Sequence, residues 1–274
     1  MNKMIINSSV TMGQLQLHLD TIANNMANSN TTGFKSRQVQ FSDLLFQQVK
    51  GLPYAENENS RITPAGTRFG SGARISSTAT NTAAGTLQQT GRSLDFALLS
   101  PESYFQIQVA GTGGQSVTEY TRDGAFYLSP SPNNPAALVL VTSDGDKVLG
   151  TNGPITIPGN YKEITIGQNG RISVTLTNGT TVNAGQLAVS TITKPDLMLS
   201  VGHHLRLPDT IRAEQVMTDA LGQEASVQQG ALESSNVDIA SEMSELVNAQ
   251  RSYQFNARTI SMADQMMGLI NGIR

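Results

Sequence analysis

Few residues of this chain have the types and spacing that metal binding or acid–base catalysis requires. The chain contains three histidines, His18, His203 and His204. Because His203 and His204 are adjacent, their side chains would point to opposite faces of a strand, and the sequence suggests no third ligand near them. We therefore interpret the histidines as surface residues and predict no metal site.

The acidic residues indicate equally little chemistry. Asp123, Asp144 and Asp146 stand in or beside turn sequences, where Asp side chains usually bond to nearby backbone groups. Asp95 and Glu102 could form the acid pair of a wall-degrading glycosidase, but nothing in the sequence fixes the distance between their carboxyl groups. We predict no catalytic residue.

Composition and motifs exclude several further classes of protein. The chain has no cysteine, which excludes disulfides, thiolate metal sites and a cysteine nucleophile. It has no Walker loop, dinucleotide fingerprint or GxSxG motif, so we predict no cofactor and no small-molecule substrate. The formal net charge of −3 and the pI of about 5.6 give no sign of nucleic-acid binding.

The low charge content favours assembly. Only 14% of the residues are charged, whereas about 25% is usual for soluble domains. Polarity comes instead from Asn, Gln, Ser and Thr, together with 25 glycines. Such a surface can pack against copies of itself without removing many ions from water. The alternative interpretation is a weakly charged monomer.

The two ends of the chain carry the helical pattern that such an assembly needs. Apolar or small residues recur every three or four positions near both termini, as in a coiled-coil seam. The C-terminal seam skips register after Ile260. The predicted assembly interface is Ile5, Met12, Leu15, Leu19, Ile22, Met26, Ile239, Met243, Leu246, Tyr253, Ile260, Met267 and Ile270.

The predicted fold class is α+β, with long terminal helices around a central all-β domain of Greek-key or barrel-like form. We expect an N-terminal helix within 1–30 and a connection at 31–93, with a short helix from Ser42 and a mobile loop near 51–72. The β domain covers 94–208, because short alternating runs are separated there by turns such as Arg122-Asp123-Gly124, Asp144-Gly145, Asn169-Gly170 and Asn178-Gly179. A return connection at 209–231 leads to the C-terminal helix within 232–274.

No targeting segment is recognisable. The N-terminal residues have no continuous apolar run of the length found in a secretory signal peptide, and no stretch reaches the roughly 18 apolar residues of a membrane span. We expect a cytoplasmic protein, or one exported by a route that does not read a cleavable signal.

Two stretches go beyond pattern and resemble the terminal signatures of the bacterial flagellar rod and hook proteins. The first runs from Leu19 to Lys35 and the second from Leu232 to Asp238, followed by Ala249 to Gln254. The matching signature residues are Asn24, Asn25, Asn28, Asn30, Thr31, Thr32, Gly33, Phe34, Asn236, Val237, Asp238, Gln250 and Arg251.

Internal segments narrow the resemblance to the distal-rod type (FlgG/FlgF-like, and FlhO/FlhP-like of bacilli). They are Gly85–Gly91, Tyr120–Phe126 and Val141–Gly145. One departure is Ser100–Phe105, where members of the family usually have a Gly-Asp-Gly-Phe-Phe-like run.

The resemblance implies a structural subunit of the flagellar basal body. Its terminal helices would assemble into a helical tube that transmits torque from motor to hook. Its partners would be copies of itself, the other axial proteins of rod and hook, and the flagellar type III export apparatus. It would be extracytoplasmic and exported without cleavage. Alternatives are another axial protein (hook or proximal rod) and a wall-active peptidoglycan hydrolase.

Overall fold

The structure is a computed structural model that describes residues 2–44, 46–48, 68–70, 72–111, 116–131, 136–218 and 226–272. The mobile loop expected near 51–72 lies outside the described residues, except for 68–70 and residue 72. The chain divides into two compact units. The first contains Met1–Met26, Arg37–Ala79 and Asp238–Arg274, and the second contains Ala27–Ser36 and Thr80–Val237.

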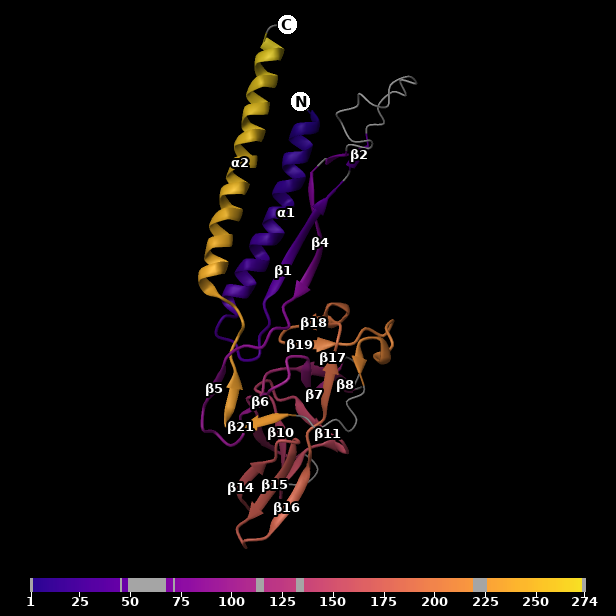
Figure 1. Ribbon diagram of the computed structural model, residues 1–274, viewed down its shortest axis with the longest axis vertical. Coiled ribbons are helices and arrows are strands. Elements are labelled where there is room, and N and C mark those ends of the chain that lie inside the picture. Colours follow the sequence, from indigo (N-terminus) through magenta and orange to yellow (C-terminus); the bar gives the residue numbers. More distant parts are fainter. Residues whose placement is uncertain are drawn as a thin grey trace, which may run out of the picture. The chain divides into compact units, whose positions relative to one another are not determined.

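The first unit pairs the two long helices. In it, α1 (Asn2–Ala27) lies beside α2 (Ile239–Gly272), and the other flank of α1 meets the two-stranded sheet of β1 (Arg37–Asp43) and β4 (Ala73–Thr80) (Figure 1). Gln14 on α1 accepts a hydrogen bond from the backbone N–H of Ile75 on β4 at 2.8 Å. A second small sheet pairs β2 (Phe46–Gln48) with β3 (Arg68–Gly70).

The short helix expected from Ser42 was wrong, because β1 continues through Ser42 to Asp43. The strand follows from its contacts on both sides. β1 pairs with β4, and Phe41 meets the ring of His18 on α1 edge-on, with 5.3 Å between centroids. Tertiary packing of this kind overrides a weak local capping signal.

The helix ends follow local sequence chemistry. Helix α1 ends at Ala27, just before the run Asn28-Ser29-Asn30. The short polar side chains of this run compete with the helix for backbone hydrogen bonds, which favours an end at this point. At the start of α2, Asp238 acts as the N-cap, because its Oδ1 accepts the backbone N–H of Ala240 at 3.0 Å. The C-terminal helix therefore begins at Ile239.

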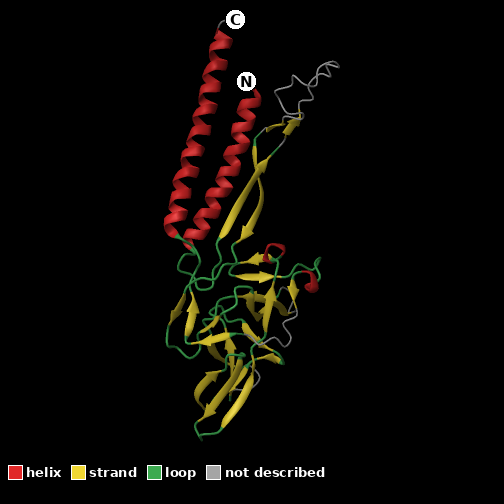
Figure 2. Cartoon of the chain, viewed as in Figure 1, coloured by secondary structure: helices red, strands yellow, loops and turns green. Residues whose placement is uncertain are grey.

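The second unit consists of antiparallel strands and two short 3-10 helices (Figure 2). Its largest sheet has eleven strands, with the main order β13-β10-β11-β7-β8-β19-β18, and a separate three-stranded sheet has the order β14-β15-β16. The strands are β5 (Leu87–Gln89), β6 (Phe96–Leu98), β7 (Ser103–Ala110), β8 (Ser116–Thr121), β9 (Tyr127–Pro130), β10 (Ala137–Val141), β11 (Lys147–Gly150), β12 (Gly153–Pro154), β13 (Thr156–Pro158), β14 (Tyr161–Ile166), β15 (Arg171–Leu176), β16 (Thr181–Gln186), β17 (Val189–Ile192), β18 (Leu199–Val201), β19 (His204–Arg206), β20 (Met217–Thr218), β21 (Val227–Gln229) and β22 (Ala231–Glu233).

Three of the predicted turns join neighbouring antiparallel strands. Gly145 lies between β10 and β11, Gly170 between β14 and β15, and Gly179 between β15 and β16, each with positive φ. The turn predicted at Asp123-Gly124 is not a hairpin, because β8 pairs with β7 and β19 whereas β9 pairs with β10. The strands on either side of Asp123-Gly124 pair with distant strands and not with each other. A two-residue turn motif carries no information about such long-range pairing.

The main core of the second unit contains three fully buried phenylalanines. The ring of Phe126 lies 5.6 Å from that of Phe96 and 5.2 Å from that of Phe105, centroid to centroid. A smaller cluster forms around Tyr104, Ile192 and Val216. The α+β class, with paired terminal helices and a central antiparallel β domain, is thus confirmed. Among the described residues, no helix has an apolar stretch long enough to cross a membrane.

Candidate assembly site

The predicted seam of α1 faces inward over its whole length. Ile22 is 1% exposed, and the remaining predicted seam residues are half-buried. Those half-buried residues are Ile5, Met12, Leu15, Leu19 and Met26. In the isolated chain, this stripe therefore packs within the first unit.

The predicted seam of α2 divides between two faces of the helix. Its half-buried members are Leu246, Tyr253, Ile260 and Met267. Ile239, Met243 and Ile270 are instead exposed, at 47%, 55% and 54%. The buried positions follow steps of three and four and include Ala249 and Ala263.

Asn25 fastens the two helices and β1 together at one point. Its side chain is buried and donates from Nδ2 to the backbone oxygen of Arg37 and to Oε1 of Glu242 on α2, each at 2.9 Å. Its Oδ1 accepts the backbone N–H of Arg37 at 3.0 Å. This signature residue therefore provides hydrogen-bond partners both for the backbone of Arg37 on β1 and for the carboxyl group of Glu242 on α2.

The surroundings of Glu242 disfavour the ionised form of its carboxyl group. Burial raises the pKa of its carboxyl group, and the carboxylates of Glu245 and Asp238 raise it further. The amide of Asn25 and the ring of His18 act in the opposite direction. Oε2 of Glu242 is buried without a hydrogen-bond partner among the described residues. The helix pair thus accommodates the protonated carboxyl group better than the ionised one.

The second unit contains a buried cluster of three charges. Oε1 of Glu233 accepts a hydrogen bond from the ammonium group of Lys35 at 2.7 Å, and Oε2 accepts one from Nε–H of Arg122 at 2.7 Å. The three side chains are 2%, 6% and 1% exposed, respectively. Arg122 also donates to three backbone oxygens, those of Ser100, Pro101 and Ser103, at 2.7–2.9 Å. The segment that departs from the family pattern thus supplies acceptors for this arginine.

The cluster shifts the pKa values of two of its members. Burial alone would raise the pKa of Glu233, but Arg122 and the hydrogen bonds from Lys35 and Gly85 outweigh burial and lower it. Burial lowers the pKa of Lys35, although its bond to Glu233 opposes this. Two cations share one carboxylate, so Glu233 is the residue whose removal would leave the most uncompensated charge.

Two glycines of the signature segments allow backbone to pass close to this cluster. Gly33 has φ +67°, and a Cβ there would stand 2.6 Å from the backbone carbon of Arg122. A Cβ on Gly85 would stand 1.9 Å from the backbone oxygen of Ser234. Only glycine fits either position without displacing backbone.

Other signature residues complete the same junction within the second unit. Asn236 accepts the backbone N–H of Ser36 at 2.8 Å and donates to the backbone oxygens of Asn81 and Ala83 at 2.9 and 3.0 Å. Thr32 donates to Asp123 at 2.7 Å. The hydroxyl of Thr31 donates a hydrogen bond to Oδ1 of Asn28 at 3.2 Å, and the backbone N–H of Asn236 donates one to the backbone oxygen of Phe34 at 3.4 Å. Val237 is half-buried. The exposed signature residues are Asn24, Asn30, Gln250 and Arg251.

Sequence reasoning missed the charge cluster. Lys35, Arg122 and Glu233 all lie in segments that resemble the family, but each was interpreted only as part of a signature. The available signal was that three uncommon buried charges occur in motifs otherwise made of small polar residues. Which charge would meet which depends on contacts between distant segments, and these leave no local pattern.

The outer face of α2 carries a row of exposed large apolar side chains. Its exposed apolar side chains, 43–70% exposed, are Ile239, Met243, Val247, Phe255, Met262, Met266, Leu269 and Ile270. A hollow of about 370 Å³ lies among Met243, Ser244, Val247 and Asn248. An open groove of about 410 Å³ lies between α1 and the sheet of β1 and β4. Its lining residues are Leu17, Asp20, Thr21 and Asn24 on α1, Arg37 on β1, and Ile75 and Thr78 on β4. Exposed apolar surface of this extent is typical of an interaction site.

Three family descriptions match this chain. Residues 7–35 match "Flagella basal body rod protein", residues 99–174 match "Flagellar hook protein FlgE/F/G D1 domain", and residues 228–273 match "Flagellar basal body rod FlgEFG protein C-terminal". The first and third contain the two signature segments. The second covers much of the central β domain.

Individual relatives match over nearly the whole length. "Flagellar hook-basal body complex protein FlhP" of Bacillus subtilis (strain 168) is 42% identical over 277 residues, covering 100% of both chains. "Flagellar basal-body rod protein FlgG" of Borreliella burgdorferi is 34% identical, and so is FlgG of Bacillus subtilis, covering 94% and 93% of each chain. The chain therefore belongs to the flagellar basal-body rod family of FlgE, FlgF and FlgG proteins, as a structural and non-enzymatic component of the flagellar basal body.

Proposed function

We propose that this protein is a subunit of the distal rod, and that copies of it assemble through their terminal helices into a helical tube that transmits torque from motor to hook. Its other partners are then the neighbouring axial proteins of rod and hook. Its placement is extracytoplasmic, and export proceeds without a cleaved signal through the flagellar type III apparatus. The full-length similarity to FlhP and FlgG supports this position in the axis.

The observation that carries the proposal is the exposed apolar face of α2. At about 1.5 Å per residue, this helix of 34 residues is about 50 Å long. Its outer face exposes eight large apolar side chains while its inner face packs against α1. Burying one such side chain contributes about 1.5–3 kcal/mol, so contacts with neighbouring copies would supply a strong driving force for assembly.

The occupant of this face is a second copy of the chain. Phe255 and Leu269, at 68% and 70% exposed, give it large apolar anchors. The low charge content of the chain, 14%, keeps the cost of removing ions from water small. A head-to-tail contact whose rotation does not close produces an open filament, which is the form a rod requires.

The direct test is to disrupt the outer face of α2 without touching its inner face. We expect Leu269→Asp, alone and with Phe255→Asp, to abolish polymerisation of the purified protein in sedimentation and electron microscopy. Circular dichroism and the melting temperature of the monomer should stay unchanged. In a motile host lacking its own copy of the protein, the variants should restore neither rods nor swimming.

The matched control is Tyr161→Asp, which places the same charge at an exposed aromatic position on β14. This control should polymerise and restore motility. Normal rods from the Leu269→Asp, Phe255→Asp double variant would contradict assembly through this face. Rods that form with the protein located in the hook or proximal rod would contradict the distal-rod position while leaving self-assembly intact.

A further inference from the structure

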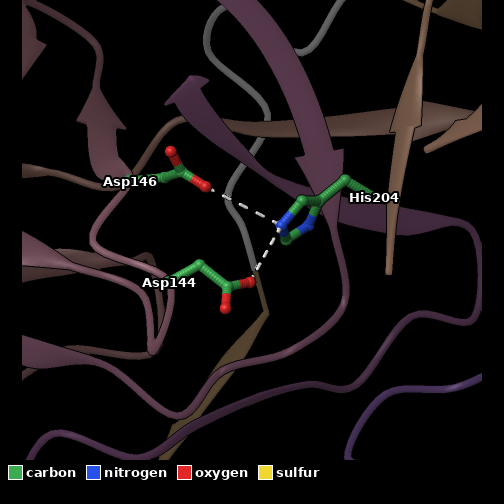
Figure 3. Close-up of side chains that lie close together, drawn as sticks. All are labelled: Asp144, Asp146 and His204. Atoms are coloured by element: carbon green, nitrogen blue, oxygen red, sulfur yellow. Dashed lines mark ion pairs between the residues drawn. The ribbon is translucent and has the colours of Figure 1, made fainter. Parts of the chain in front are cut away.

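Three metal-ligating side chains from two separate hairpins converge in the second unit. Asp144 and Asp146 stand in the turn between β10 and β11, and His204 is the first residue of β19. Figure 3 shows Nε2 of His204 turned toward both carboxylates. It lies 3.7 Å from Oδ2 of Asp144 and 3.9 Å from Oδ2 of Asp146, and one ligand atom from each residue lies within 4.8 Å of the others.

These distances are longer than those of hydrogen bonds and lie in the range of ion pairs, which leaves room for an ion between the three groups. A hydrogen bond between a ring nitrogen and a carboxylate would bring the atoms to about 2.7–3.2 Å. Ligand atoms placed tetrahedrally at about 2.1 Å from one metal ion lie about 3.4 Å from each other. Small rotations of the exposed Asp144 side chain and the partly buried Asp146 side chain would bring the three atoms to that separation.

The imidazole of His204 lacks the partners that a buried polar group requires. The side chain is only 12% exposed, and Nε2 is the ring nitrogen that faces the carboxylates (Figure 3). The carboxylates that Nε2 faces stand beyond hydrogen-bonding distance. An ion between the three groups would give Nε2 the partner that the carboxylates do not provide at these distances.

The local charge also favours a cation. Glu119 is a further carboxylate near Asp146, and it is already paired with Arg206. A divalent ion between the three groups would offset the repulsion between the carboxylates of Asp144 and Asp146.

We propose that Asp144, Asp146 and His204 form a binding site for a divalent first-row transition-metal ion, with Zn²⁺ as the best match. One imidazole nitrogen and two carboxylates suit Zn²⁺, and water can complete the coordination sphere. Ca²⁺ and Mg²⁺ fit less well, because they prefer a shell made entirely of oxygen.

The site would join two parts of the sheet that share no backbone hydrogen bonds. In the sheet order, β7 and β8 lie between β11 and β19. A bound ion would therefore fasten the β10–β11 turn directly to the β18–β19 hairpin. Its effect would be to stiffen the second unit, and it does not depend on how copies of the chain assemble.

The test is a titration of the full chain, stripped with a chelator, with Zn²⁺ alone. Calorimetry should show one site per chain, and Zn²⁺ should raise the melting temperature. His204→Gln and Asp146→Asn should each weaken binding at least about tenfold, which is the size of loss expected for a group at a metal centre. Both variants should retain the circular dichroism spectrum of the parent protein.

The matched control is His203→Gln, which removes the adjacent, exposed imidazole and should bind Zn²⁺ as the parent does. Should His204→Gln fail to fold, Asp144→Asn carries the test, since that turn side chain is 63% exposed. No heat of binding up to about 100 µM Zn²⁺, or equal binding by parent and His204→Gln, would overturn the site. Loss of binding in His203→Gln alone would overturn it too, because the ligand would then be the neighbouring ring.

Discussion

Lys35 and Glu233, which are 198 residues apart, form a buried ion pair with 2.7 Å between Nζ and Oε1. One residue ends the N-terminal signature and the other lies inside the C-terminal signature. The pair therefore closes the second unit by joining the two segments that identify the family. Arg122, from the middle of the chain, bonds to the other oxygen of the same carboxylate.

Glu233→Gln should destabilise the second unit strongly. The change leaves Lys35 and Arg122 buried without a counter-charge, which typically costs about 3–5 kcal/mol. Urea unfolding of the full chain at pH 7 measures the loss. Glu163→Gln makes the same change at an exposed position on β14 and should stay within about 0.5 kcal/mol of the parent. Equal stability of the two variants would show that the cluster contributes little.

The same carboxylate predicts a sensitivity to acid. The pKa of Glu233 lies below its ordinary value of 4.5, so its contribution to stability is fully present above pH 4.5. That contribution is lost as the pH falls through the lower pKa of the folded state, because protonation breaks both ion pairs. Unfolding followed from pH 5 downward should show a shallower loss of stability in Glu233→Gln than in the parent.

Gly33→Ala should cost more than the backbone conformation alone explains. A residue with a side chain at φ +67° is strained by about 1–2 kcal/mol, and the Cβ would also meet the backbone of Arg122 at 2.6 Å. Gly179→Ala is the matched control, because its φ is +83° but nothing lies within 4 Å of the added Cβ. Melting temperatures should therefore fall further for Gly33→Ala. A smaller fall than for the control would mean that the close approach is easily relieved.

Asn25→Asp should loosen the helix pair at neutral pH. The amide donor to Arg37 and Glu242 is lost, and a new carboxylate faces that of Glu242, at a cost of about 2–4 kcal/mol. Hydrogen exchange of amides along α1 and α2 reports the effect. Asn160→Asp, an exposed change of the same kind, should leave exchange as it is. Protection should partly return below about pH 4, since a protonated carboxyl can donate a hydrogen bond.

Glu242→Gln should have the opposite sign. The pKa of Glu242 is raised, so the charged form is disfavoured in the folded chain, and stability declines as the pH rises through that pKa. The amide keeps an acceptor for Asn25 and removes the charge. We expect a gain of roughly 0.5 kcal/mol at pH 7, discounted for screening by solvent, and none below about pH 4. A loss at pH 7 would indicate that the carboxylate charge itself holds the helices together.

The sequence predicted what depends on local periodicity. The N-terminal helix expected within 1–30 runs over Asn2–Ala27, and the Gly-containing turns at Gly145, Gly170 and Gly179 join antiparallel strands. Hydrophobic period and turn chemistry are properties of a few neighbouring residues, so one sequence suffices to recognise them.

What depends on distant contacts was not predictable. Both Met243 and Leu246 lie on one apolar pattern, but only the packing of α1 decides which is exposed. His204 was expected on the surface and is nearly buried, because the β18–β19 hairpin pairs with β8 beside the turn of Asp144. The sequence gives no reason to distinguish His203 from His204, whereas in the structure His203 is exposed and the side chain of His204 is 12% exposed.

The position of the charge cluster also makes the fold sensitive to chain length. Lys35 lies near one end of the chain and Glu233 near the other, so the cluster cannot close until almost all residues are available. A chain that stops before residue 233 lacks the carboxylate that neutralises Lys35 and Arg122, so burying these two cations would be costly and we expect its second unit to be open to proteolysis.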